Sequence, residues 1–330
     1  MLALRYHTIG KLAELRLEEV PVPQPAAGEV LVRVRAASIN PVDWKIMTGH
    51  FRVLVRGGLP RTMGSDFAGE VVQTGAGVTS FAPGDRVFGS LDPFKRAAGS
   101  FADFVAVPER YAYRIPAAVP FVDAAALACV GATAVTLCDL ARVGAGSRVL
   151  VNGASGGVGH ISVQVARARG ADVTATASAA RRDFVLGLGA STCIDYRNVP
   201  MEQWPGGFDA VLDCVPNIPR RLHHALLNRG GHYVTTVPGP ATFLLDPLLN
   251  RLGRMHRHGV MLQPNAATMQ ELLAYAAQGR LRCAIEQQFP LPDAAAAVAR
   301  SRSGRVVGKI VITGTSERSP SHAAASPPPR

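Results

Sequence analysis

The chain has 330 residues, of which 48% are hydrophobic and 18% charged, and its formal net charge is +11. This length is enough for two domains with separate cores, and the composition is that of a soluble globular protein. No uninterrupted apolar run reaches membrane-spanning length, so we expect no membrane partner.

The positive charge is spread along the chain rather than gathered in one block. The net charge is +3 over residues 1–122, +4 over 123–262 and +4 over 263–330. Proteins that bind nucleic acid carry a clustered basic patch or stripe. The distribution therefore favours a solvated basic surface over a nucleic-acid partner.

The cysteines and the N-terminus bear on the compartment. The cysteine count is odd and no C-x-x-C pair occurs, which predicts reduced, mostly buried thiols at Cys129, Cys138, Cys193, Cys214 and Cys283. The first residues lack the basic, apolar and cleavage segments of a signal peptide. We therefore expect a cytoplasmic protein.

Residues 1–122 have the pattern of a compact β-rich domain. Apolar and polar residues alternate over 29–36, and similar short runs at 70–73 and 85–88 are separated by proline and glycine. From Asp123 the chain becomes alanine-rich and helical, and strand and helix patterns then alternate. The strand candidates are 148–151, 172–177, 192–195, 210–213, 232–236 and 259–262. Six strands with helical crossovers predict a doubly wound parallel sheet.

A glycine cluster follows the first of these strands. The chain there changes from a β-branched strand to helical spacing through a run of small residues, Gly153, Ala154, Ser155, Gly156, Gly157, Val158 and Gly159. Glycine allows positive φ and lets the backbone approach a pyrophosphate, which the N-terminus of the following helix then stabilises. The pattern favours a dinucleotide-binding turn over a structural glycine turn.

The end of the second strand indicates which dinucleotide is bound. Domains that prefer NAD place an acidic residue there, whereas this chain has Ser178 followed by Arg181 and Arg182. An arginine makes bidentate contacts to a phosphate, so we predict NADP(H). The alternative is that both arginines are solvated at a helix start.

After the sixth strand we expect a helix over 266–277 and then a return to strand and loop that ends at 309–312. This last piece is expected to rejoin the first domain. Residues 315–330 consist mainly of serine, proline, alanine and charged residues without apolar periodicity, which predicts a disordered tail.

Together these stretches resemble the medium-chain dehydrogenase/reductase superfamily, in particular its zinc-free quinone oxidoreductase and enone reductase branch, which includes zeta-crystallin-like proteins. The matching motifs are 37–45, 64–71, 84–87, 99–103, 153–159 and 304–309. The resemblance implies an α/β fold in which a GroES-like β-rich domain, 1–122 plus 263–314, contains an inserted Rossmann domain, 123–262.

Zinc-dependent relatives carry Gly-His-Glu where this chain has Gly64-Ser65-Asp66, together with a four-cysteine lobe in the first domain. No cysteine precedes Cys129, so we expect no zinc. The histidine pairs, His223 with His224 and His256 with His258, are interpreted as polar surface or loop residues.

By the same resemblance, Asn40, Asp43 and Lys45 lie in the loop that faces the nicotinamide. Lys45 would stabilise developing negative charge or donate a proton, and Asn40 would orient the substrate. Many quinone reductases have tyrosine where Lys45 aligns, so water is an alternative donor and Lys45 an alternative surface residue. Asp43 is equally expected to cap a helix beginning near Trp44.

Three further residues are assigned to the cofactor site by the resemblance. Thr133 is expected to begin a helix near the nicotinamide, or else only to cap that helix. Tyr196 is expected beside the adenosine end, or else as a half-buried strand-end aromatic. Lys309 ends the 304–309 motif.

The function implied is NADPH-dependent hydride transfer to quinones or α,β-unsaturated carbonyl compounds. An enoyl-thioester reductase of lipid or polyketide metabolism would use the same chemistry. A non-catalytic NADPH-bound protein that binds RNA or serves a structural role is the third hypothesis. A homodimer is expected by family analogy alone.

Overall fold

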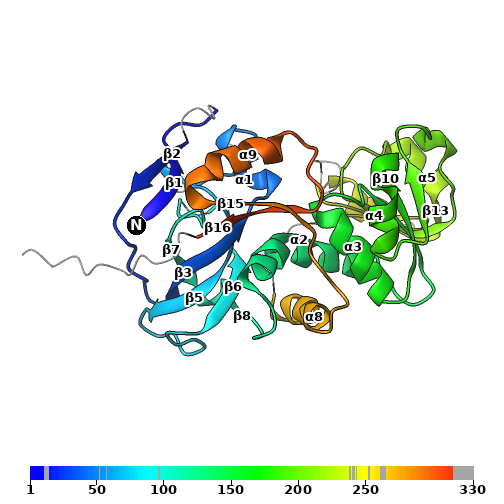
Figure 1. Ribbon diagram of the computed structural model, residues 1–330. Helices are drawn as coiled ribbons and strands as arrows, with labels where there is room; N and C mark the ends of the chain where they lie inside the picture. The colour runs from blue at the N-terminus through cyan, green and yellow to red at the C-terminus, as the bar shows by residue number, and fades with distance from the viewer. Residues whose placement is uncertain are drawn as a thin grey trace, which may run out of the picture.

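The computed structural model describes residues 1–10, 15–51, 53–56, 58–95, 97–237, 239, 242, 244–251, 253–260 and 265–314. These residues form two bodies side by side, a β-rich one that carries the N-terminus and one built on a parallel sheet (Figure 1). The tail predicted at 315–330 lies outside the described residues.

The β-rich body is built on a seven-stranded sheet. Its order is β15-β16-β3-β5-β6-β8, and β7 pairs with β3 off this path. The strands are β3 (Glu29–Ser38), β5 (Asp66–Thr74), β6 (Arg86–Ser90), β7 (Phe104–Pro108), β8 (Tyr113–Arg114), β15 (Ile285–Pro290) and β16 (Lys309–Thr313). Because β16 pairs antiparallel with β3, the C-terminal strands share a sheet with the first third of the chain.

Alternating residues of β3 build the core of this body. Val30, Val32 and Val34 are buried and pack with Phe67 and Phe101 in one apolar cluster. A second sheet, of order β2-β1-β4, comprises β1 (Leu2–Tyr6), β2 (Arg16–Glu19) and β4 (Arg61–Thr62). The short helix α1 (Pro41–Met47) packs against α9 (Ala294–Arg302).

The second body contains a six-stranded parallel sheet of order β11-β10-β9-β12-β13-β14. Its strands are β9 (Arg148–Asn152), β10 (Asp172–Ala177), β11 (Thr192–Asp195), β12 (Phe208–Asp213), β13 (Leu227–Thr235) and β14 (His256–Gly259). In chain order this is 3-2-1-4-5-6, the arrangement of the Rossmann fold. Buried residues alternate between two apolar clusters, with Leu150 and Val211 in one and Val149 and Leu212 in the other.

The sixth strand was predicted at the wrong place. It spans His256–Gly259 instead of 259–262, whose last two residues lie outside the described part of the chain. The predicted surface or loop position of His256 and His258 is therefore also wrong, because both rings stack near His232 on β13. An edge strand needs less apolar surface than a central one, so the hydrophobic pattern did not reveal it.

His223 also differs from its predicted surface position. It is 2% exposed, and its ring stacks on Tyr233 with 3.7 Å between centroids. Burial lowers the pKa of His223 to about 4. His224 is exposed, as predicted.

Helix α2 (Phe121–Leu140) runs between the two bodies (Figure 1). It contacts β3, β5, β6 and β16 on one side and α3 (Gly157–Ala168) and α8 (Ala266–Ala277) on the other. By length and composition alone α2 qualifies as a membrane span, but 72% of its most apolar window is buried. A helix that is apolar all round and buried in this way is a core helix.

Helix α8 spans the residues predicted for it. A Cβ built on Gly131 of α2 would lie 2.4 Å from Leu272 Cδ2, so glycine permits the close approach of these helices. Arg169 pairs with Glu271 at 2.9 Å. These contacts favour placing α8 in the Rossmann domain, with the second domain boundary after it. The predicted boundaries at 122 and 263 stay a prediction.

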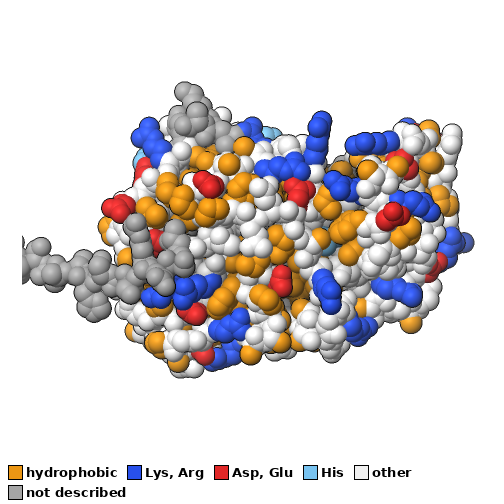
Figure 2. Space-filling view, in the orientation of Figure 1, with side chains coloured by type: hydrophobic (Ala, Val, Ile, Leu, Met, Phe, Trp, Pro, Cys, Tyr) orange, Lys and Arg blue, Asp and Glu red, His pale blue; other side chains and the backbone are white. Residues whose placement is uncertain are grey.

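The remaining helices of this body are short: α4 (Arg182–Gly187), α5 (His223–Leu226) and α7 (Asp246–Asn250). Figure 2 shows one face of the molecule, on which Lys and Arg side chains are scattered among other types. This face carries no continuous basic stripe.

Candidate active site

The glycine turn, residues 153–159, connects β9 to α3. Gly153 has φ +76°, and a Cβ built on it would lie 2.0 Å from Val215 Cγ2. A Cβ on Gly159 would lie 2.2 Å from the carbonyl oxygen of Gly153. Sterics therefore require glycine at both positions, since backbone and side-chain atoms fill the space.

The turn presents the N-terminus of α3 to the carboxyl edge of the sheet. Gly156 is the N-cap residue, and no side chain caps it. Gly157 and Val158 follow in the first turn, where backbone N–H groups have no intrahelical partner. Strand order reverses between β9 and β12, and ligands of such sheets bind at that point. The turn therefore fits the pyrophosphate of a dinucleotide.

A buried polar network supports the turn from below. Thr176 Oγ1 accepts from the N–H of Gly153 at 3.0 Å and donates to Asn152 Oδ1 at 2.7 Å. Asn152 Nδ2 donates to Asp213 at 2.8 Å, and the hydroxyl of Tyr233 donates to the same carboxylate. Burial, with the Asp213 carboxylate nearby, raises the pKa of Tyr233. The network joins the ends of four strands and fixes the turn on the sheet.

The predicted adenosine-end residues lie together at the end of β10. Ser178 directly follows that strand, and the N–H of Tyr196 donates to Ala177 O at 3.4 Å. Tyr196 is 48% exposed. Arg182 donates to Cys193 O at 2.9 Å, whereas exposed Arg181 has no ion-pair partner among the residues described. Both arginines are exposed, and the guanidinium of Arg182 uses one N–H in this hydrogen bond.

Helix α1 begins three residues earlier than predicted. Asn40 is its N-cap and Pro41 its first residue, a position that suits the fixed φ of proline. Asp43 occupies the third position, where its carboxylate accepts from the N–H of Asn40 at 2.8 Å. Asp43 is therefore not the N-cap of a helix beginning near Trp44, but its carboxylate does help to cap α1, as the third residue of a capping box.

Side chains from three distant segments meet behind this helix. The Lys309 cluster comprises Ser38, Asn40, Asp43, Ser65, Asp66 and Lys309, all buried. Lys309 Nζ donates to Ile39 O and to Asn40 Oδ1, both at 2.7 Å, and lies 3.8 Å from Asp66 Oδ2. This Asp66 oxygen accepts from Asn40 Nδ2 and Ser38 Oγ, both at 2.7 Å.

The cluster contains one ammonium, that of Lys309, and two acidic side chains, those of Asp43 and Asp66. Ser65 Oγ donates to Asp43 Oδ1 at 3.0 Å, and Oδ1 of Asp66 is buried with no hydrogen-bond partner. Burial, together with the negative charge of Asp66, raises the pKa of Asp43 to about 7, while the hydrogen bonds from Asn40 and Ser65 and the charge of Lys309 oppose the shift. The carboxyl of Asp43 therefore keeps its proton to a higher pH than an ordinary aspartic acid does.

Two predicted site residues lie outside the cluster. Lys45 is half-buried on α1, with Nζ 5.8 Å from the Trp44 ring. Thr133 lies in the middle of α2, where its hydroxyl donates to Cys129 O at 2.8 Å, so the prediction that it begins or caps a helix is wrong. Gly131 suggested a break there, but it serves helix packing instead.

The two bodies are joined directly at the glycine turn. The N–H of Gly308 donates to Ser155 O at 3.0 Å. His160 Nε2 accepts from the N–H of Ala284 at 3.1 Å, which leaves its Nδ1 to donate to Gly156 O at 2.9 Å. Burial lowers the pKa of His160 to about 4, consistent with this neutral ring. The ammonium of Lys309 is engaged with Ile39 and Asn40, and its predicted contact with the cofactor stays a prediction.

Comparison with known proteins agrees with this architecture. An alcohol dehydrogenase GroES-like domain matches residues 26–117, and a zinc-binding dehydrogenase family matches residues 188–312. A chloroplast envelope quinone oxidoreductase homolog of Arabidopsis thaliana is 33% identical over 94% of this chain and 98% of its own. The chain belongs to the medium-chain dehydrogenase/reductase superfamily. It is therefore an oxidoreductase, as predicted, and members of this superfamily bind nicotinamide cofactors.

Other members of the superfamily extend the comparison. The 2-methylene-furan-3-one reductase of Solanum lycopersicum is 31% identical over 94% of this chain and 79% of its own. The quinone oxidoreductase of Coxiella burnetii has a TM-score of 0.87 at 29% identity, covering 95% of this chain and 99% of that one. A mycobacterial protein complexed with NADPH has a TM-score of 0.80 at 26% identity, covering 95% and 99%. The predicted fold, a GroES-like domain with a Rossmann domain, is confirmed.

One of the matching family descriptions names zinc, and the residues of this dehydrogenase/reductase do not fit that metal. Within the described ranges, no group of three His, Cys, Asp or Glu side chains is placed to hold a metal ion. Ser65 and Asp66 stand where a zinc enzyme would carry histidine and glutamate, and the ammonium of Lys309 lies beside Asp66.

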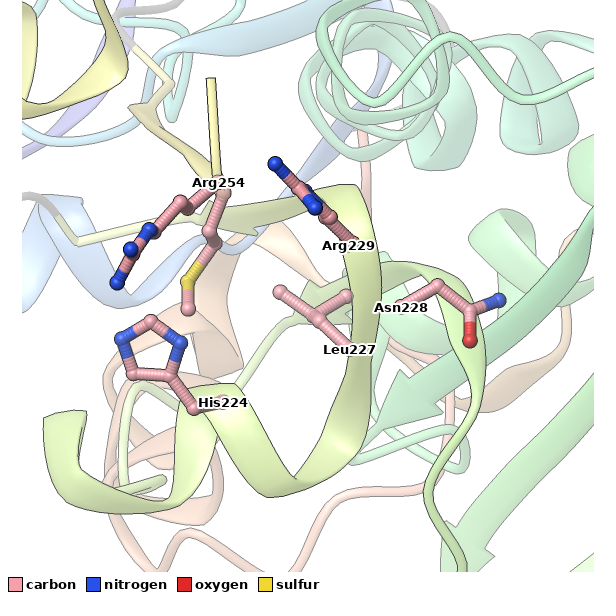
Figure 3. Close-up of a pocket in the computed structure, with 6 residues that line it drawn as sticks. His224, Leu227, Asn228, Arg229 and Arg254 are labelled. Atoms are coloured by element: carbon pink, nitrogen blue, oxygen red, sulfur yellow. The ribbon is translucent and has the colours of Figure 1, made fainter. Parts of the chain in front are cut away.

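A separate pocket of this dehydrogenase/reductase lies away from the glycine turn. Figure 3 shows it lined by His224, Leu227, Asn228, Arg229, Arg254 and Met255. His224 lies on α5, and the other residues lie at the start of β13 and just before β14, which is the amino edge of the parallel sheet. The glycine turn lies at the carboxyl edge, so we do not place the cofactor in this pocket.

Sequence reasoning missed the residues that hold the site in place. Asn152, Thr176 and Asp213 stand at or near the carboxyl ends of predicted strands, and polar residues there were an available signal. His160 and Asp66 gave no such signal, because their partners lie far away in sequence.

Proposed function

We propose that the protein is an NADPH-dependent reductase that transfers hydride to quinones or to α,β-unsaturated carbonyl compounds without zinc. The observation that carries the proposal is the Lys309 cluster, which buries an ammonium and two carboxyl groups where a zinc dehydrogenase presents metal ligands. The names of the quinone oxidoreductase and enone reductase relatives support the substrate class.

Quinones and enones suit a site without a metal because their acceptor carbon is already electrophilic. Bound NADPH supplies the hydride. As hydride arrives, negative charge develops on the substrate oxygen, which needs a stabilising group and then a proton. We assign Lys45 to stabilise that oxygen, with Lys45 or a water molecule as proton donor. Asn40 and Asp43 are already hydrogen-bonded within the cluster, so we assign them to fixing the start of α1, the helix that carries Lys45.

We further propose a preference for NADPH over NADH. No carboxylate stands at Ser178, and the exposed guanidinium of Arg181 lies in the same short segment. A carboxylate there would bind the ribose 2′-hydroxyl and repel a 2′-phosphate. We expect S178D/R181A to shift the ratio of kcat/KM values toward NADH by about 30-fold, or roughly 2 kcal/mol. Unchanged selectivity would refute the preference.

Turnover tests the function itself. The wild-type protein with NADPH is offered 9,10-phenanthrenequinone, short alkenals and trans-2-enoyl thioesters in parallel. We expect oxidation of NADPH with the first two classes. Turnover of thioesters alone would instead identify an enoyl-thioester reductase. Absence of turnover across all three, with salt-sensitive RNA binding that NADPH displaces, would favour the non-catalytic hypothesis.

We also propose a cytoplasmic homodimer. The five cysteines are free, which suits a reducing compartment. Strand β14 ends the parallel sheet as described and offers an edge for pairing across a two-fold axis. Sedimentation at two concentrations tests the dimer, and a monomeric mass at both would reject it.

A further inference from the structure

Lys309 is a buried cation at the junction of the two bodies. Its side chain is only 3% exposed. Its ammonium donates hydrogen bonds to Ile39 O and Asn40 Oδ1 and forms an ion pair with Asp66. Burying an ammonium costs free energy unless acceptors and an opposite charge surround it. The loop before α1 supplies two of those acceptors, so the lysine fixes both the backbone and the N-cap side chain of that loop.

The backbone of the same segment touches the glycine turn. Gly308, the residue before Lys309, donates its N–H to Ser155 O at 3.0 Å. A Cβ built on Gly157 would lie 3.4 Å from Lys309 Cδ, so the stem of the lysine passes beside the first turn of α3. The stem of this residue therefore lies beside the turn, while its ammonium is hydrogen-bonded to Ile39 and Asn40.

We propose that Lys309 is a positioning residue that sets the catalytic segment, residues 39–45, relative to the glycine turn. This segment comprises Ile39, the N-cap residue Asn40 and the first five residues of α1. Substrate held by the catalytic segment is then aligned with the cofactor held by the glycine turn, because Gly308 and Lys309 bond to the turn and to the segment. The inference rests on the proposed function. It assigns Lys309 to positioning the catalytic segment and not to binding the cofactor directly.

Three variants test the proposal: K309M, D66N and the double variant D66N/K309M, which keeps the net charge of the wild type. K309M leaves Asp66 without its cation and is expected to lower the melting temperature. D66N/K309M removes that charge too, while the asparagine still offers an acceptor to Ser38 or Asn40, so we expect its melting temperature to approach that of D66N alone. Relative to D66N, the double variant should lose about tenfold or more in kcat with 9,10-phenanthrenequinone, while Kd for NADPH changes by less than about threefold.

The ion pair of Asp92 and Lys95, which lies closer to solvent than the Lys309 cluster, provides the matched control. Its atoms are 3.1 Å apart and the Lys95 side chain is 71% exposed. We expect D92N/K95M to keep the wild-type kcat and Kd. A stable D66N/K309M with the kcat of D66N would overturn the proposal, and so would a tenfold rise in Kd with kcat retained, which would assign the lysine to the cofactor.

Hydrogen exchange separates this inference from the proposed function. NADPH is expected to protect the amides of residues 39–45 in D66N and not in D66N/K309M, whether or not any quinone is reduced. Equal protection in both variants would overturn the coupling. Loss of protection in a protein that reduces no quinone would support the coupling and reject only the proposed substrate class.

Discussion

The glycine turn and the Lys309 cluster lie next to each other but are built in different ways. The turn is one continuous stretch, residues 153–159, and its geometry depends on backbone sterics at Gly153 and Gly159. The cluster joins side chains from residues 38–43, 65–66 and 309. The first can be recognised in a window of the sequence, whereas the second exists only once the chain has folded.

The two regions also use different electrostatics. The turn offers uncharged N–H groups and the end of a helix dipole. The cluster buries formal charges that must balance one another. Changes in the turn should therefore act mainly on cofactor affinity, and changes in the cluster mainly on stability, on its pH dependence and on kcat. Four substitutions test this contrast, beginning with the largest expected effect.

Asp66→Ala should cause the largest loss. It leaves the ammonium of Lys309 buried without an opposite charge and removes the acceptor of Ser38 and Asn40. We expect the free energy of unfolding, measured in urea, to fall by about 3–5 kcal/mol. Asp92→Ala, in the ion pair closer to solvent, serves as the control. A loss equal to that of the control would mean that the cluster does not carry buried charge.

Gly159→Ala should instead act on cofactor binding. The added Cβ meets Gly153 O at 2.2 Å, so the helix has to move away from the turn. We expect Kd for NADPH to rise about 100-fold, or about 2.7 kcal/mol, in a fluorescence titration. Gly187→Ala, where a Cβ meets nothing within 4 Å, should leave Kd unchanged. An unchanged Kd in Gly159→Ala would show that the close approach is not needed.

Asp43 should make stability depend on pH. Its folded pKa of about 7 lies above the ordinary value of 3.8, so its contribution is fully present below the unfolded pKa and is lost as pH rises through 7. Between pH 5 and pH 8 we expect wild type to lose about 2 kcal/mol relative to Asp43→Asn in urea unfolding. Parallel pH profiles for the two proteins would contradict a proton held by Asp43.

Tyr196→Ala should give the smallest effect. The ring is 48% exposed beside Ala177 and Ser178, where it is free to stack on an adenine. We expect a rise of about fivefold in Kd for NADPH, or about 1 kcal/mol, with unchanged stability. An unchanged Kd would place the adenine elsewhere.

Local pattern predicted most of the fold. Five of the six parallel strands and helix α8 were placed correctly because their apolar spacing is strong. The errors share a cause. Thr133 followed a glycine that permits packing rather than ending a helix, and His256 lies on an edge strand that needs little apolar surface. Tertiary contacts decided each of these positions.

The candidate site divides in the same way. The turn, Ser178 and Arg181 can be proposed from sequence, because a strand, a turn and the next strand end follow at fixed intervals. The partners of Asp66, His160 and Lys309 could not be predicted, because their hydrogen bonds span 26 to 270 residues. No window of the sequence contains both partners of such a bond.

The sequence by itself determined a superfamily fold and the place of its dinucleotide turn, since glycine sterics and strand periodicity act over a few residues. Only the tertiary structure decided that Asn40 caps α1, that Asp43 is a buried acid and that Lys309 donates to Asn40 in the catalytic segment. A buried charge takes its pKa and its partner from whatever the folded chain packs around it, and that environment is not written in any one segment.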